Sequence, residues 1–267
     1  MTASFSGAKF ATVNGIKICY EEAGEGKPIF LIHGLTSDRQ SMKPMAGLLP
    51  EGYKAIAYDT RGHGESDKPS SYTLADHGPD LFGLMDALGY EKAVVIGHSM
   101  GSYIAAAAAT QHPERIEKLI LVATKTNGAT SSVQRILGKL GMDVATATPE
   151  QMIAAIASAT FAPMTPKSLI MEIMKLSAQA KQLSQEEKAA EAMSLNGFDL
   201  RPEYHKITTP TLVISGEFDG LNPPEWGEEA ANLIPGAQYV LMKNVGHVMH
   251  MENPQEFTAI VREFLLG

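Results

Sequence analysis

The sequence is poor in the residues that define several other protein classes. Cysteine occurs once, at Cys19, in a chain of 267 residues. A single thiol forms no disulfide within the chain, so a disulfide scaffold and a cysteine-based metal site are both excluded. Within "IKICYEE" we expect Cys19 to be a small apolar residue of a strand.

Long apolar runs and clusters of basic residues are also missing. No stretch approaches the roughly 18 apolar residues of a membrane-spanning helix. The 22 lysines and arginines are scattered and the formal net charge is −8, so the chain lacks a surface for nucleic acid or anionic lipid. The opening "MTASFSGAKFATVNG" does not resemble a leader peptide. We therefore expect a cytoplasmic monomer or homodimer that acts on a small molecule, without nucleic-acid or membrane partners.

What is present favours a compact α/β protein. The hydrophobic content is 44%, enough for a large buried core. The runs "AKFATV" and "IKICYEEA", joined by Asn14-Gly15, predict a hairpin. Continuous apolar runs then alternate with helical patterns, which indicates a largely parallel sheet covered by helices on both faces. We expect further strands at 28–34, 53–59, 92–97, 117–123, 210–216 and 237–242, and helices at 73–89, 102–113, 224–234 and 253–266.

The alternation stops between residues 124 and 201, where the sequence has only helical patterns. Thr148 and Ser184 each precede a Gln or Glu by three residues, which is typical of a capping box at a helix start. We therefore predict a core domain of residues 1–123 and 202–267 and a helical cap of residues 124–201. Methionine and isoleucine are frequent in the cap, and they either pack its core or line a substrate pocket. The candidates for substrate contact are Met142, Met152, Ile153, Met171 and Met174.

The pentapeptide "GHSMG", residues 97–101, joins an expected strand to an expected helix. A G-x-S-x-G sequence in this context is the nucleophile elbow described for α/β-hydrolases. Gly97 and Gly101 give the turn room, while His98 and Met100 flank Ser99. We predict that Ser99 is the nucleophile and that the Met100 N–H binds an oxyanion. The alternative is a glycine-rich turn with a purely structural role.

A serine hydroxyl needs a base and an orienting acid, which in this arrangement follow the nucleophile in the order acid, then histidine. His247 lies in the late loop "KNVGHVMHMENP" and is preferred over His250. For the acid, "TLVISGEFDG" presents two carboxylates after a strand, and Asp219 is preferred over Glu217 because it lies further into the loop. The sequence therefore predicts a Ser99, His247 and Asp219 triad.

Two other loops contribute candidates with supporting roles. In "LIHGLTSD" the Leu35 N–H is the predicted second oxyanion donor, with His33 and Gly34 supporting the loop. The segment "YDTRGHGESD" has the glycines of a phosphate loop but lacks its Gly-Lys-Ser/Thr sequence. We interpret its charged residues as a hydrogen-bonded loop scaffold.

Taken in order, "LIHGLTSD", "YDTRGHGESD", "VVIGHSMGS", "TLVISGEFD" and "NVGHVMHMENPQEF" resemble the α/β-hydrolase fold superfamily over nearly the whole chain. The resemblance implies an eight-stranded, mostly parallel sheet flanked by helices, with a helical cap inserted after the sixth strand. It also implies that the protein uses no cofactor and no metal. Among its members, the motifs are most similar to small bacterial serine esterases and enol-lactonases.

This resemblance leaves related chemistries open. Val248 follows His247 where carbon–carbon bond hydrolases of ring-cleavage products carry an aromatic residue, and Arg135 alone is a poor match to their carboxylate-binding residues. Cofactor-free perhydrolases use the same triad, and a ligand-binding protein without turnover retains the same fold. We expect two-step acyl transfer on a small, largely apolar ester or lactone.

Overall fold

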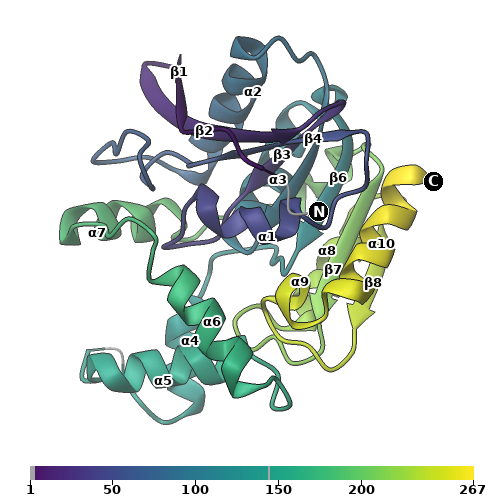
Figure 1. Ribbon diagram of the computed structural model, residues 1–267. Helices are drawn as coiled ribbons and strands as arrows, with labels where there is room; N and C mark the ends of the chain where they lie inside the picture. The colour runs from purple at the N-terminus through teal and green to yellow at the C-terminus, as the bar shows by residue number, and fades with distance from the viewer. Residues whose placement is uncertain (1–3, 144) are drawn as a thin grey trace.

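The computed structural model describes residues 4–143 and 145–267. Its centre is a sheet of eight strands in the order β1-β2-β4-β3-β5-β6-β7-β8 (Figure 1). The first three strands in this order are antiparallel neighbours, and all the other pairs are parallel. The expected mostly parallel sheet is therefore confirmed. The strands are β1 (Lys9–Val13), β2 (Ile16–Gly24), β3 (Lys27–Ile32), β4 (Tyr53–Tyr58), β5 (Ala93–His98), β6 (Ile116–Val122), β7 (Thr211–Gly216) and β8 (Gln238–Met242).

Helices cover both faces of this sheet, as the continuous apolar strands require. One face carries α2 (His77–Ala87), α3 (Met100–Gln111) and α8 (Pro224–Leu233). The other carries α1 (Lys43–Ala46), α9 (Met249–Glu252) and α10 (Pro254–Leu266). The five alanines at 105–109 are fully buried, and their small side chains let α3 lie close to β5 and β6. Short 3-10 turns complete the core: η1 (Arg39–Met42), η2 (Leu74–Asp76), η3 (Pro113–Arg115) and η4 (Arg201–Lys206).

Four helices separate β6 from β7 along the chain, at the place expected from the sequence. They are α4 (Ser132–Lys139), α5 (Pro149–Thr160), α6 (Lys167–Ser177) and α7 (Gln185–Ser194), and residues 124–201 are called the inserted segment below. Figure 1 shows α4, α5 and α6 grouped at the lower end of the view, away from α2 and α10. A single antiparallel bridge between Asn127 and Asp199 joins the two ends of the segment.

The starts of these helices follow from local sequence. The capping boxes predicted at Thr148 and Ser184 are both present, since each hydroxyl accepts the N–H of the residue three positions later. A third box, at Ser131, starts α4 and was not singled out in the sequence. Within the described residues, no helix is both long and apolar enough to cross a membrane.

Candidate active site

Ser99 occupies a sharp turn between β5 and α3. Its backbone has φ 55° and ψ −121°, a conformation that is strained for any residue with a side chain. The Ser99 N–H donates to the carbonyl of Val122 over 2.9 Å, which ties the turn to the end of β6. The hydroxyl therefore stands at the carboxyl edge of the sheet, at the N-terminus of α3.

The glycines around this turn are required by close backbone approaches. A Cβ atom on Gly97 would lie 2.1 Å from the Gly101 carbonyl oxygen, and one on Gly101 would lie 2.1 Å from that of Ile32. Gly34 faces Ser99 from the loop after β3, with its Cβ position 3.4 Å from the Ser99 Cβ. A side chain at Gly97 would push the end of β5 away from α3, and one at Gly101 would push the Ser99 turn away from β3.

The side chains predicted as acid and base, Asp219 and His247, meet beside this turn. The His247 Nδ1 lies 2.8 Å from the Asp219 Oδ2, and the two residues are only 5% and 2% exposed. The other oxygen, Asp219 Oδ1, accepts the N–H groups of Leu221 (2.9 Å) and Asn222 (2.8 Å). A carboxylate at Nδ1 requires the proton on that nitrogen, which leaves the lone pair on Nε2.

Glu217, the alternative acid, points elsewhere and pairs with Lys243 at the surface. No hydrogen bond joins the Ser99 Oγ to His247 in the described part of the chain. The two loops are joined instead through the neighbouring residue, because His98 Nε2 lies 2.9 Å from the His247 carbonyl oxygen and donates to it.

Asn222 and Tyr103 support the acid from behind. The Asn222 side chain donates to the Tyr103 hydroxyl (2.6 Å) and to the Ala123 carbonyl (2.7 Å). Tyr103 lies one turn after Ser99 on α3, so this network links the acid loop to the nucleophile helix. Sequence reasoning did not identify either residue, because only the fold brings their elements together.

Buried histidines surround the base. Burial and the neighbouring His247 lower the pKa of His98 far below its usual range. The same two causes lower the pKa of His250 to about 4. The His98 ring lies 4.9 Å from that of His247 and 5.2 Å from that of His250, measured between centroids. Both neighbours are therefore neutral near pH 7, and their close approach to His247 does not add positive charge.

The two predicted oxyanion donors, one in the loop after β3 and one at the start of α3, have free N–H groups. In the described residues, neither the Leu35 N–H nor the Met100 N–H donates to another group. His33 accepts the Thr60 N–H at Nε2 (3.1 Å) and donates from Nδ1 to the Gly34 carbonyl (2.8 Å). Burial and nearby His63 lower the pKa of His33 to about 3, so it is a neutral support of this loop.

Glu191 connects the inserted segment to the same loop. It lies on α7 and is buried. Its Oε1 accepts one hydrogen bond from the Thr36 N–H (2.8 Å) and another from His63 Nε2. Thr36 follows Leu35 directly and has a positive φ of 55°, so the loop is held in a conformation that it would not adopt freely. The sequence contained no signal for this contact, which spans 155 residues.

The end of α5 is hydrogen-bonded to the loops that contain Asp219 and His247. The Thr160 carbonyl accepts the His247 N–H and the Ala159 carbonyl accepts the Gly220 N–H, each over 2.7 Å. Glu252 adds a further link, since it accepts N–H groups from Gly246 and Ala162 over 3.0 Å. The inserted segment thus contacts the loops of both the acid and the base.

The side chains proposed to line a pocket in this segment fall into two groups. Met142 and Met152 pack with Ile136, Leu137 and Ala155 in a small cluster between α4 and α5. Ile153, Met171 and Met174 are instead 57%, 71% and 43% exposed. Two of the five therefore contribute to internal packing, and three present accessible apolar side chains.

The charged loop after β4 has the hydrogen bonds expected of a scaffold. Asp59 accepts from the backbone and guanidinium of Arg39. Arg61 pairs with Asp80. Cys19, Asp59 and Glu65 form the one grouping with metal-ligand spacing in the described residues. Arg39 already donates to both of these carboxylates, and burial raises the pKa of the Cys19 thiol to about 12, which disfavours metal binding.

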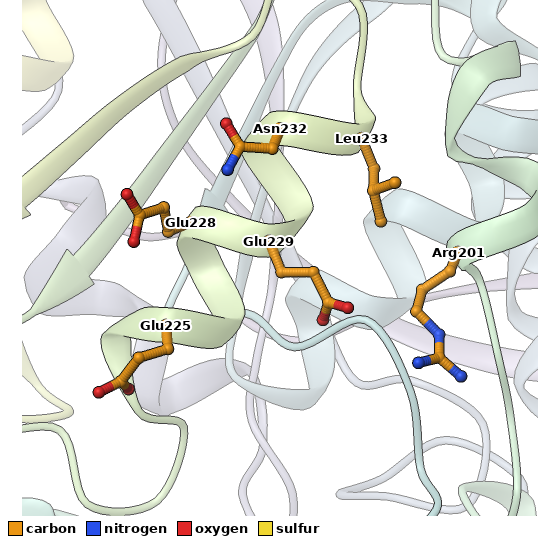
Figure 2. A pocket seen from close by; sticks show the side chains of 6 residues that line it. All are labelled: Arg201, Glu225, Glu228, Glu229, Asn232 and Leu233. Atoms are coloured by element: carbon orange, nitrogen blue, oxygen red, sulfur yellow. The ribbon is translucent and has the colours of Figure 1, made fainter.

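A separate hollow lies on the outer side of α8, opposite η4, and none of the triad residues lines it. Figure 2 shows three glutamates of α8 on one side of it and Arg201 on the other. The acidic side chains make this hollow a solvated surface feature away from the catalytic loops. Its lining residues are Arg201, Glu225, Glu228, Glu229, Asn232 and Leu233.

Known proteins resemble the chain over its whole length. The family model described as alpha/beta hydrolase fold matches residues 27–254. The structure of the enol-lactonase from Burkholderia xenovorans is 30% identical, with a TM-score of 0.84, and the match covers 97% of this chain and 100% of that one. A thermophilic esterase from Thermogutta terrifontis is 29% identical, with a TM-score of 0.82 and 98% of each chain covered. The 2-(acetamidomethylene)succinate hydrolase of Mesorhizobium japonicum is 24% identical over 95% of this chain and 93% of its own length.

Proposed function

Because this chain belongs to the α/β-hydrolase fold family, we propose that it is a serine hydrolase that cleaves a carboxylic ester or lactone of a small, largely apolar substrate. The observation that carries the proposal is the 2.8 Å contact between His247 and Asp219, held beside the strained Ser99 turn. The likeness to an enol-lactonase and an esterase supports the same type of reaction.

The proposed reaction has two acyl-transfer steps. His247 Nε2 removes the Ser99 proton as the oxygen attacks the substrate carbonyl, and Asp219 stabilises the imidazolium that forms. The protonated His247 then passes that proton to the leaving alkoxide, which leaves an acyl-enzyme. Water, deprotonated by His247, attacks the acyl-enzyme, and His247 then returns the proton to the Ser99 oxygen as the acid is released. The hydrogen bonds of Leu221 and Asn222 to Asp219 keep this carboxylate in place throughout.

Two backbone N–H groups are proposed to stabilise the negative charge of each tetrahedral intermediate. The Met100 N–H lies at the start of α3, where the helix dipole also favours an anion. The Leu35 N–H comes from the loop that His33 and Glu191 hold in place. Donors that are oriented before the reaction need no rearrangement when the charge appears.

Active-site labelling tests this proposal. A fluorophosphonate probe should label the wild-type chain and the Ser70→Ala control, in which an exposed serine is changed, but not Ser99→Ala. Asp219→Asn and His247→Gln should each lower kcat on p-nitrophenyl butyrate by roughly a thousandfold or more, because the base is lost or held in the wrong tautomer. Labelling that persists in Ser99→Ala, or a wild-type chain that turns over no ester or lactone, would contradict the proposal.

A further inference from the structure

Lys125 is a buried cation without a conventional partner. It follows β6 by three residues and is only 7% exposed. Its ammonium lies among three aromatic rings, 5.4 Å from the centroid of Tyr103, 5.7 Å from Phe198 and 5.8 Å from Trp226. Within the described chain, no carboxylate lies within ion-pair distance of it and no group accepts a hydrogen bond from it. Cation–π contacts offset only part of the cost of removing an ammonium from water.

Arg135 brings a second cation to the same place. It extends from α4 of the inserted segment, and its guanidinium carbon lies 5.1 Å from the centroid of the Trp226 ring. Its Nη2 donates to the carbonyls of Gly220 and Leu221, but its shielded Nε has no partner in the described residues. Arg135 therefore keeps an unused donor and contacts the same Trp226 ring as Lys125.

The charges around this pair do not balance. Burial, reinforced by Arg135, lowers the pKa of Lys125 to about 8, and burial also lowers the pKa of Arg135. Asp219 and Glu225 are the carboxylates that act on Arg135, and neither lies within ion-pair distance of it. The Asp219 oxygens are already used by His247, Leu221 and Asn222. Buried cations in proteins are normally paired, so this place is suited to an anion from outside the chain.

The location of this pair connects it to the catalytic site. Arg135 donates to the two residues that directly follow Asp219 in the acid loop. Tyr103, whose ring faces Lys125, hydrogen-bonds to Asn222 and lies one turn after Ser99 on α3. The two cations therefore lie on the Asp219 side of the proposed site, where the inserted segment meets the core.

We propose that Lys125 and Arg135 bind a carboxylate carried by the substrate itself. The inference rests on the proposed function and narrows it, because the preferred substrates become half-esters of dicarboxylic acids, or lactones that bear a carboxylate on an otherwise apolar chain. The ammonium and the free Nε–H each donate to a carboxylate oxygen. Accessible apolar side chains of the inserted segment remain available to contact the apolar part of the substrate.

A pair of matched esters tests the assignment. Mono-p-nitrophenyl adipate and p-nitrophenyl hexanoate have the same chain length and leaving group, and differ in the terminal carboxylate. The wild-type chain should have the higher kcat/KM for the adipate ester. Lys125→Met should lower that value at least tenfold, mainly through KM, and change the hexanoate value less than twofold. Arg135→Met also removes hydrogen bonds to the acid loop, so it should lower both values, and the adipate value by at least tenfold more. Lys139→Met, an exposed lysine of α4, is the matched control and should change neither value.

Binding and stability give readouts that do not depend on turnover. Adipate should bind to Ser99→Ala in calorimetric titrations more tightly than hexanamide, which has the same chain length and no carboxylate, and adding Lys125→Met should abolish this difference. Without ligand, the Tm of Lys125→Met should equal or exceed that of the wild type, because a buried unpaired charge has been removed. A lysine with a structural role would instead lower Tm, so a clear drop in Tm would contradict the inference.

The outcomes separate this inference from the proposed function. If fluorophosphonate labels Ser99 but the two esters are hydrolysed equally well, the carboxylate site is wrong and the serine hydrolase stands. Equal losses of kcat/KM for both esters in Lys125→Met would also contradict the proposed carboxylate site. If the wild type is not labelled, the proposed function fails, and the titrations with adipate still show whether the two cations bind a carboxylate.

Discussion

At Ser99 the backbone holds a positive φ of 55°, and at His247 a buried carboxylate sets the tautomer of the ring. The role proposed for His247 requires the histidine rings beside it to remain uncharged. His98 and His250 meet this condition because burial makes their protonated forms unfavourable. Single residues thus influence the proposed reaction through protonation state as much as through position.

Acid should destabilise the protein through these histidines. His250 has an ordinary pKa of 6.5 when unfolded and of about 4 when folded, so below pH 6.5 the unfolded chain binds the extra proton. Its contribution to the free energy of unfolding is complete above pH 6.5 and falls by about 1.4 kcal/mol per pH unit as pH drops toward 4. Urea unfolding at pH 7.5 and 5.0 should show this loss in the free energy of unfolding. The loss should be smaller by about 2 kcal/mol in His250→Leu. Equal losses in both proteins would contradict this reading of His250.

The helices of the inserted segment do more than separate β6 from β7. The carboxyl end of α5 hydrogen-bonds to the loops of Asp219 and His247, and α7 contributes Glu191 to the loop of Leu35. The amphipathic pattern of these helices predicted where they form, because it arises from local periodicity. Their contacts with the core depend on how the helices pack, which periodicity does not specify.

Glu191 should act as a positioning residue for the loop of Leu35. Glu191→Ala removes the acceptor for the Thr36 N–H and for His63, so kcat should fall about tenfold with little change in KM. Glu191→Gln keeps one acceptor oxygen and should lie between Glu191→Ala and the wild type. Glu186→Ala, an exposed residue of the same helix, is the control.

A trifluoromethyl ketone inhibitor distinguishes positioning from simple stabilisation of the fold, because it forms an oxyanion on the nucleophile. It should bind Glu191→Ala at least tenfold more weakly than the wild type, while an unreactive amide inhibitor should bind both equally. Parallel losses for the two inhibitors would indicate a general structural effect and not a defect at the Leu35 loop.

Over the whole molecule, the core and the inserted segment depend on each other. The parallel sheet brings the ends of β3, β5, β7 and β8 to one edge, where every predicted catalytic loop begins. Thr160 and Ala159 then complete two of these loops from the inserted segment. The candidate active site is therefore built by both parts of the chain, and the segment contributes more than a cover.

Removal of the inserted segment tests this dependence. Gly128 and Phe198 are hydrogen-bonded across its base, so residues 129–197 are replaceable by a short Gly-Ser turn. The shortened chain should retain the circular dichroism of the core, but fluorophosphonate labelling of Ser99 should slow at least tenfold, because His247 loses the Thr160 carbonyl. Faster or unchanged labelling would indicate that the segment only restricts access.

A single substitution provides the same test in the full-length chain. A Cβ atom on Gly220 would lie 2.9 Å from Ala159, so Gly220→Ala should displace α5 from the acid loop and slow labelling as well.

By itself, the sequence determined the strands, most of the helices, the strained serine turn and the loops at the sheet edge, since these follow from apolar periodicity, capping residues and glycine spacing. Asp219 was chosen over Glu217 from its place in a loop, and the structure pairs it with His247. Only the tertiary structure brought Glu191 to the Leu35 loop and both Lys125 and Arg135 to Trp226. These contacts join residues from distant parts of the chain, and hydrogen bonding and charge pairing across such distances leave no local pattern in the sequence.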